Sequence, residues 1–183
     1  MRRLPWLPIT IIAAMVIMAV FAPFLAEHSP TDQSLIKRLK PPFWIDGGST
    51  QHLLGTDQFG RDVFSRMLYG ARISLIVVGL SLLVGGGIGL AIGIVSGYIG
   101  GKLDAFLMRL VDAAFTFPAI LFALLLAVTM GQGLNTLIIA ISLLLWANFA
   151  RVIRGEVLAL KQRDFVSLAR VHGCSPLRIM VTH

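Results

Sequence analysis

Long runs of apolar residues, separated by short clusters of charge, constrain this chain more than any other feature. A helix needs about 20 mostly apolar residues to span the hydrocarbon core of a bilayer. Candidate spans occupy residues 4–26, 73–97, 103–130 and 134–150. The pattern therefore predicts an all-α fold, a polytopic membrane helical bundle with four spans.

The balance of residue types supports lipid rather than water as the surroundings. Hydrophobic residues make up 56% of the chain and charged residues 14%, whereas a soluble domain carries about 25% charged residues. The net charge of +7 does not indicate nucleic acid, because the Lys and Arg residues lie at the edges of apolar runs rather than along one face. Membrane topology and anionic headgroups account for them. We predict membrane lipid as a partner and no nucleic acid.

The residues that carry most enzyme chemistry are sparse. Cys174 is the single cysteine, and the four histidines are far apart in the sequence. No nucleophile motif and no phosphate-binding glycine loop is present. An intramembrane enzyme would need a Ser–His, Asp–Asp or metal pair inside the bilayer, and no span has His, Asp or Glu in its apolar centre. We predict no enzymatic activity, no metal and no bound cofactor.

The distribution of positive charge predicts the orientation. Arg2 and Arg3 precede the first run, which is long for a cleaved signal peptide, and Phe24 occupies a position where cleavage after Ala26 would need a small residue. We therefore favour a retained anchor over a signal peptide. The stretch 27–72 holds six basic and five acidic residues, so it is nearly neutral. With a cytoplasmic N-terminus, the strongly basic stretches also lie inside.

Glycines recur at every fourth position in the second run. On a helix they form a ridge without side chains, which lets two helices in lipid approach closely. The pattern predicts a tight helix–helix seam, and a smooth seam of this kind would also permit small sliding or rotation. The seam residues are Gly85, Gly89, Gly93, Gly97 and Gly101.

Two features interrupt the third run. Pro118 removes a backbone hydrogen bond and is expected to bend or start a helix. Before it, Asp104, Met108 and Asp112 share one helix face. That face is either a solvated helix end or a polar contact to a neighbouring subunit or a cavity wall.

A short helix is predicted after the fourth run. Asp164 suits a helix N-cap, Phe165 and Leu168 fall at helical spacing, and Gly173 is a natural stop. The helix, about residues 164–173, is too short to span. It serves either to dock a soluble partner on the cytoplasmic side or as a bent interfacial connection.

Several separated stretches resemble one transporter family. They are residues 52–75, with Gly-Thr-Asp57-Gln-Phe-Gly60-Arg61-Asp62; the Gly97–Gly101 glycines followed by Asp112 and Pro118; residues 151–173; and Ala22-Pro23-Phe24 in the first span. Together they resemble the inner-membrane permease subunit of ATP-binding-cassette importers, in the dipeptide, oligopeptide and nickel permease family. The fold implied is a type I importer permease, with four spans and the start of a fifth.

The resemblance implies a role for the short helix. In that family the coupling helix, with an EAA-type motif, docks on the ATPase subunit. The matching positions are Asp164, Phe165, Val166, Ser167, Leu168, Ala169, Arg170 and Gly173. Ser167-Leu168-Ala169 stands where the family usually has Glu-Ala-Ala, so this chain lacks the motif's carboxylate.

The resemblance also implies partners and a cargo. The partners are a second permease subunit, two cytoplasmic ATP-binding subunits that bind the ATP, and an external solute-binding protein. Transport by alternating access would move short peptides, or alternatively nickel or another small solute, across the inner membrane.

The resemblance divides the chain into two parts. Residues 1–72 form an anchor helix and an external segment, and residues 73–183 form a partial permease core. The family continues with two further spans, whereas this sequence stops at His183, shortly after a fifth span begins at Leu177. We expect a truncated permease, with a non-functional remnant or a small membrane interaction protein as the alternative.

Overall fold

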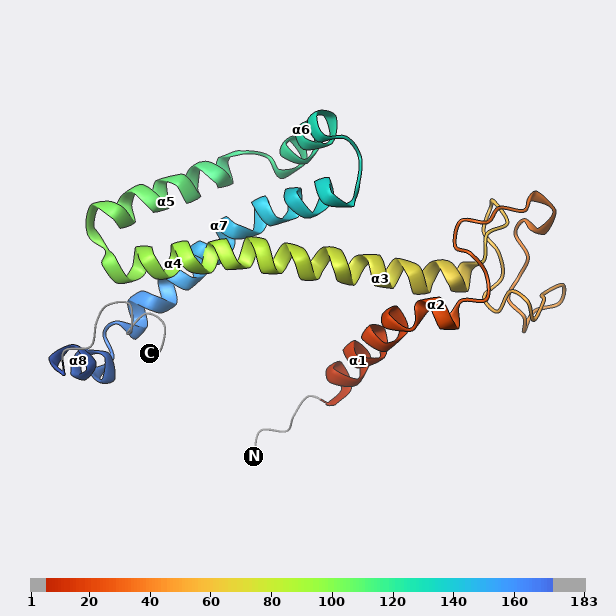
Figure 1. Cartoon of the computed structure of the whole chain (residues 1–183), viewed down its shortest axis with the longest axis horizontal. Helices are drawn as coiled ribbons and strands as arrows, with labels where there is room; N and C mark the ends of the chain where they lie inside the picture. Colours follow the sequence, from red (N-terminus) through yellow and green to blue (C-terminus); the bar gives the residue numbers. More distant parts are fainter. Residues whose placement is uncertain (1–5, 173–183) are drawn as a thin grey trace. The chain divides into compact units, whose positions relative to one another are not determined.

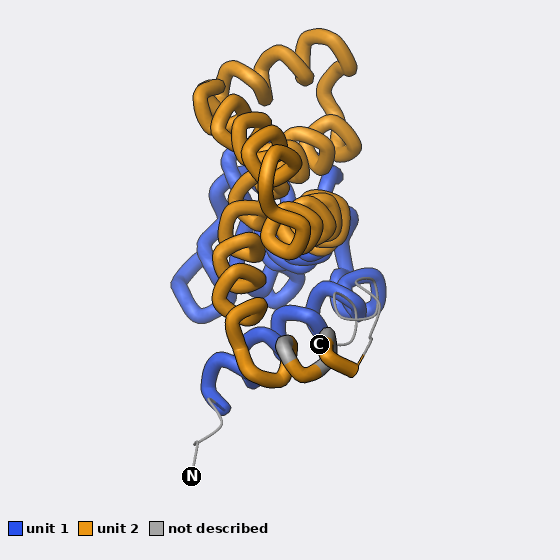
Figure 2. The backbone as a smooth tube through the Cα atoms, turned by 90° about the vertical axis from the view of Figure 1, so that its left-hand side faces the viewer, with its two compact units in different colours: residues 1–76 blue, residues 77–183 orange. Residues whose placement is uncertain are grey.

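The structure is a computed structural model that describes residues 6–172. In this range the regular secondary structure is helical, apart from one isolated bridge between Thr56 and Asp62. The all-helical fold predicted from the sequence is therefore confirmed for the described residues. The chain divides into two compact units, residues 1–76 and 77–183 (Figure 2). The functional division between residues 72 and 73 stays a prediction.

Unit 1 begins with two apolar helices, α1 (Trp6–Val20) and α2 (Ala22–Leu25). In α1 only Ala19 is buried. A helix that is apolar all round and exposed all round is typical of a lipid-facing segment. Its 15 residues extend about 22 Å, which is less than the hydrocarbon thickness of about 30 Å. A first span over residues 4–26 stays a prediction.

The segment between α2 and α3 is ordered by its own backbone. It contains a single short helix, η1 (Leu35–Lys37). The Ser34 amide donates to the Phe59 carbonyl at 3.2 Å, and the Leu39 amide donates to the Asp57 carbonyl at 3.1 Å. Gly60 has a φ of +72°, and a Cβ there would lie 1.8 Å from the Ser34 carbonyl oxygen. The close approach of residues 34–40 to residues 55–60 thus needs glycine at this position.

Asp57 holds the turn that closes this segment. Its carboxylate accepts the backbone N–H groups of Phe59 at 2.8 Å and Arg61 at 3.0 Å, and the Arg61 Nε–H at 2.7 Å. Desolvation raises the pKa of Asp57, but the Arg61 and Phe59 hydrogen bonds outweigh it and lower the pKa from 3.8 to about 2. The turn is therefore stabilised by the ionised form.

The lowered pKa of Asp57 predicts acid sensitivity of this segment. A carboxylate with a depressed pKa in the folded state contributes stability above its unfolded pKa, and that contribution is lost as the pH falls through the folded value. We expect Trp44 fluorescence, with Trp6 and Trp146 replaced by Phe, to change as the pH falls from 3.8 to about 2. Asp57→Asn should reduce this transition, since Asp62, whose pKa is also lowered, still titrates, whereas Asp46→Asn, at an exposed position of the same segment, should leave it unchanged. An unchanged transition in Asp57→Asn would contradict the prediction.

A buried pair anchors the start of α3 (Val63–Ser81). The Asp62 carboxylate accepts the Ser65 backbone N–H at 2.7 Å and lies 3.1 Å from Nδ1 of His52. Both side chains are buried. Burial raises the pKa of Asp62, but hydrogen bonds from Ser65 and His52 lower it overall. Asp62 thereby satisfies a free N–H group at the start of the helix.

Among residues 6–172, two helices are long and apolar enough to cross a membrane. One runs from Val63 to Ile99, as α3 continues through a π-helical turn, η2 (Leu82–Gly86), into α4 (Gly87–Ile99). The other is α7 (Leu134–Leu160), which continues ten residues beyond the predicted end at Ala150. A third span results if α5 (Gly101–Thr116) and α6 (Ala119–Met130) are counted together. The predicted four spans and start of a fifth stay a prediction.

The third predicted span is sharply broken. Helices α5 and α6 meet at an angle of 83°. Phe117 is extended, and Pro118 caps the start of α6, because proline disfavours the helical conformation of the residue before it. The sequence predicted that Pro118 either bends or starts a helix, and in the structure it starts α6.

Helices α4, α5 and α7 pack together in unit 2 (Figure 1). Their core is formed by Val111 of α5 with Ala147 and Ala150 of α7. The alanines are small, which brings the helix axes close and leaves little room for lipid between them. This three-helix contact positions the site described next.

Candidate coupling site at the ends of α4, α5 and α7

The glycine ridge of the second run lies against α7. A Cβ placed at Gly85 would lie 2.5 Å from the Ser142 carbonyl oxygen, and one at Gly89 would lie 2.4 Å from the Trp146 carbonyl oxygen. At Gly93 the nearest atom would be Cβ of Ile153 at 2.7 Å, and at Gly97 it would be Cβ of Val157 at 2.8 Å. We call this contact the glycine seam. No side chain fits between the two helices at these four positions.

Gly101 does not belong to the glycine seam, contrary to the sequence-based expectation. Nothing lies within 4 Å of a Cβ placed there. The reason is that α4 ends at Ile99, and Gly100 and Gly101 both have positive φ values, +71° and +64°. The four-residue repeat therefore continues past the helix, and its last member begins α5.

A partly buried ion pair joins α5 to α7 beside the end of the glycine seam. Arg154 donates from Nε and Nη2 to the two carboxylate oxygens of Asp104, both at 2.6 Å. The Ser96 hydroxyl, which is fully buried, donates to the same carboxylate at 2.5 Å. The Asp104 side chain is 15% exposed and that of Arg154 is 32% exposed. A two-pronged guanidinium–carboxylate contact fixes orientation as well as distance.

A second basic residue links the C-terminal ends of α4 and α7. Lys161, the residue after α7, donates from Nζ to the Tyr98 carbonyl oxygen at 2.6 Å. Tyr98 lies in the last turn of α4, where backbone carbonyls have no partner within the helix. The positive charge also suits the negative end of the helix dipole. We call Ser96, Asp104, Arg154 and Lys161 the polar clasp.

A more exposed pair lies along the same two helices. Arg151 donates to the Asp112 carboxylate at 2.7 Å, with the side chains 54% and 68% exposed. Its guanidinium also lies 4.2 Å from the centroid of the Phe115 ring. The acidic face of α5 thus contacts α7 of the same chain, through both Asp104 and Asp112. The two alternatives drawn from the sequence had not included an intramolecular partner.

The predicted docking helix is α8 (Asp164–Val171). It follows α7 after the turn at residues 161–163, and the Val166 amide donates to the Arg163 carbonyl at 3.1 Å. Asp164 is the first residue of the helix, and Phe165 to Arg170 follow on it. Gly173 and the residues after it lie outside the described residues.

The apolar side chains of α8 divide between burial and exposure. Val166 is buried, whereas Phe165 and Leu168 are 46% and 57% exposed. Phe165 and Leu168 are three residues apart, so they lie on neighbouring positions of one helix face. The helix therefore presents apolar side chains that the described part of the chain leaves uncovered.

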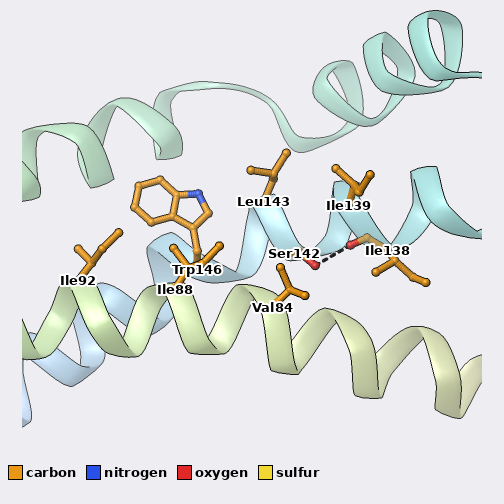
Figure 3. A pocket seen from close by; sticks show the side chains of 8 residues that line it. All are labelled: Val84, Ile88, Ile92, Ile138, Ile139, Ser142, Leu143 and Trp146. Carbon is orange, nitrogen blue, oxygen red and sulfur yellow. Dashed lines mark hydrogen bonds between the residues drawn. The ribbon is translucent and has the colours of Figure 1, made fainter.

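An apolar cavity of about 410 Å³ lies beside the glycine seam (Figure 3). Isoleucines from both helices line it, Trp146 lies at one end, and the Ser142 hydroxyl donates within its own helix to the Ile138 carbonyl at 2.7 Å. The lining is almost wholly apolar and includes no charged side chain. An apolar side chain or an acyl chain fits this chemistry, and the charged ends of a peptide do not.

The sequence indicated the polar clasp only in part. Asp104 stood out as an acidic residue before an apolar run, but Arg154 is 50 residues away, and no local spacing links the two. Opposite charges at the adjoining ends of two apolar runs were the available signal. Within residues 6–172, no group of three or more His, Cys, Asp or Glu side chains could hold a metal ion.

Comparison with known protein families gives two matches. The family described as the binding-protein-dependent transport system inner membrane component matches residues 89–183. These residues include most of the glycine seam and the whole polar clasp. The N-terminal TM domain of oligopeptide transport permease C matches residues 3–42.

Individual curated proteins are also similar. The dipeptide transport system permease protein of Bacillus subtilis is 42% identical over 90% of this chain and 49% of its own length. The oligopeptide transport system permease protein of the same organism is 35% identical over 100% of this chain and 58% of its own. The nickel transport system permease protein of Escherichia coli K12 is 38% identical over 97% of this chain and 62% of its own. The chain therefore spans about half to three fifths of the length of these relatives.

Proposed function

Because the chain belongs to the family of binding-protein-dependent transport system inner membrane components, we propose that it forms part of the membrane pathway of an ATP-driven importer. The cargo is a short peptide, as in the names of the dipeptide and oligopeptide relatives. Nickel is the second candidate, because a nickel permease is 38% identical over nearly the whole chain. The chain is a multi-pass inner-membrane component, and its N-terminus faces the cytoplasm.

The observation that carries the proposal is the continuous connection from α8 to the membrane helices. Helix α8 follows α7 after a three-residue turn. The polar clasp then holds the end of α7 to α4 and α5, and the glycine seam continues the contact. A displacement of α8 would therefore be transmitted to three membrane helices at once.

The partners follow from this role. Two cytoplasmic subunits bind ATP, and one of them docks on the coupling helix, about residues 164–173. A second permease subunit completes the pathway, and an external solute-binding protein delivers the cargo. The chain itself needs no cofactor, and ATP-driven closure of the partners drives alternating access. The uncovered apolar side chains of α8 support the docking role.

The docking role can be tested on the exposed face of α8. Because Phe165 and Leu168 are half exposed, replacing both by Ala should leave the chain folded and reduce co-purification of the ATP-binding subunit by about tenfold or more, as loss of two apolar anchors predicts. The control is Phe106→Ala with Leu110→Ala, a pair of exposed residues on α5. Equal recovery of the ATP-binding subunit with both double variants would exclude docking through this face.

Transport itself is tested in proteoliposomes that contain the chain with its partner subunits. We expect ATP-dependent accumulation of a radiolabelled dipeptide, competed by other short peptides. Accumulation of radioactive nickel, without uptake of the dipeptide, would instead establish the second candidate. Failure to accumulate either solute would overturn the proposed function.

A further inference from the structure

The segment between α2 and α3 exposes apolar side chains outside the candidate spans. Leu35 and Ile36 of η1 are 74% and 96% exposed, and Leu39 and Trp44 are 63% and 60% exposed. Exposed apolar groups of this size in one short segment mark an interaction site rather than an ordinary water-facing loop. We call residues 35–45 the apolar–basic surface.

Basic residues alternate with these apolar ones. Lys37, Arg38 and Lys40 lie within four positions, and residues 35–45 contain no acidic residue. Long basic side chains place their carbon stems against apolar material while their charges reach polar headgroups. The surface therefore combines an apolar component with a threefold positive charge.

The backbone keeps these side chains exposed. The Lys40 amide donates to Oγ1 of Thr56 at 2.9 Å, and the Lys40 carbonyl accepts the Thr56 amide at 3.0 Å. Leu39, the residue before Lys40, has a φ of +53°, and no other non-glycine residue among residues 6–172 has a positive φ. This conformation is unfavourable for a residue with a Cβ atom. The fold thus holds Leu39 in an unfavourable conformation with its side chain uncovered.

The helices that flank the apolar–basic surface and its positive charge indicate what binds it. The segment leaves α2 at Leu25 and enters α3 at Val63, and α3 begins a helix, Val63–Ile99, that is long and apolar enough to span. The surface is thus attached to the membrane region at both ends. Basic residues with leucine, isoleucine and tryptophan are the composition that binds at the boundary between headgroups and acyl chains of anionic membranes. Tryptophan in particular prefers that boundary.

We propose that the apolar–basic surface lies on the bilayer, in the leaflet that α3 enters, and binds anionic phospholipid. Leu35, Ile36 and Trp44 insert at the level of the headgroups. Lys37, Arg38 and Lys40 pair with the phosphates. The contact gives the external segment a fixed position against the membrane, independently of whether the chain transports peptide or nickel.

The test measures the depth of a spin label at Ile36. The full chain, with Cys174→Ser and Ile36→Cys, is labelled and reconstituted in phosphatidylcholine vesicles with or without phosphatidylglycerol. Oxygen concentrates in lipid, whereas chromium oxalate stays in water, so the ratio of the two accessibilities reports insertion. A label at Gln33→Cys, an exposed polar position two residues before η1, is the matched control.

We expect the label at position 36 to be accessible to oxygen and protected from chromium oxalate, most strongly with phosphatidylglycerol, while the label at position 33 stays in water. Lys37→Glu with Arg38→Glu should shift the equilibrium of the label at position 36 between its membrane-inserted and water-exposed states. We expect a shift toward the water-exposed state of about fivefold or more for each positive charge lost. Lys102→Glu, an exposed basic residue in unit 2, should not shift it.

Two results would overturn the proposal. One is equal exposure of positions 33 and 36 to chromium oxalate in both kinds of vesicle. The other is protection of position 36 only after a solute-binding protein is added, which would make the surface a protein-docking site instead.

Discussion

Replacement of Gly89 by alanine is expected to separate α4 from α7 and to destabilise the chain by about 3 kcal/mol. The added Cβ would lie 2.4 Å from the Trp146 carbonyl oxygen, 2.5 Å from Cβ of Phe149 and 3.0 Å from the Ala150 backbone nitrogen. Two of these three atoms belong to the backbone and the third is a Cβ, so no side-chain rotation relieves the clash. The helices must move apart, which opens the contact along the whole glycine seam.

Thermal unfolding in detergent, followed through Trp146 fluorescence, measures this effect. We expect the midpoint to fall by roughly 10 °C. Gly87→Ala is the matched control, because it adds the same methyl group to the same helix where nothing lies within 4 Å. Similar unfolding temperatures for the two variants would show that the close approach of α4 and α7 contributes little to stability.

Replacement of Arg154 by alanine should have the second-largest effect. It leaves the Asp104 carboxylate largely buried, with only the Ser96 hydroxyl as a remaining partner. Removing one member of a fully buried pair costs about 3–5 kcal/mol, and the one-third exposure of Arg154 reduces the expected cost to about 2 kcal/mol. Arg154→Lys keeps the charge but loses the two-pronged geometry, so it should recover only part of the stability.

Arg151 provides the control for this experiment. It makes an equally short contact to Asp112 from the same face of α7, but both side chains are more than half exposed. Exposed pairs contribute about 0–1 kcal/mol, so Arg151→Ala should have little effect. If Arg154→Ala and Arg151→Ala lowered the unfolding temperature equally, burial of the Asp104 pair would not be what stabilises the polar clasp.

The sequence predicted the features that depend on local pattern. Apolar run length indicated the helical class, and the four-residue glycine repeat identified four residues that contact α7, though not Gly101. Asp164 marks the start of α8, as its first helical residue rather than as the predicted N-cap. Each of these signals lies within one element. The apolar pattern predicts a span that ends at Ala150, and the helix that contains it continues to Leu160.

What the sequence missed depends on pairs of elements. Arg154, beyond Ala150 on α7, donates two hydrogen bonds to Asp104, which also accepts the Ser96 hydroxyl, and Asp104 lies 50 residues away in the sequence. Gly101 shared the glycine repeat, but the break at Gly100 is set by backbone conformation rather than by hydropathy. The exposure of Leu39 likewise depends on backbone hydrogen bonds of Leu39 and Lys40 to Asp57 and Thr56. A hydrophobic periodicity does not predict such bonds.

The four-residue period of the glycine seam has a mechanical consequence. A shift of α4 along α7 by one period, about 6 Å, would bring three of the four glycines opposite sites that another glycine occupied before. A shift of less than one period would instead bring the larger residues between the glycines against α7, so the repeat favours discrete positions of α4 over the small continuous sliding expected from a smooth seam. Helix α5 begins two residues after α4 ends, so such a shift would also have to break the hydrogen bonds between Asp104 and Arg154.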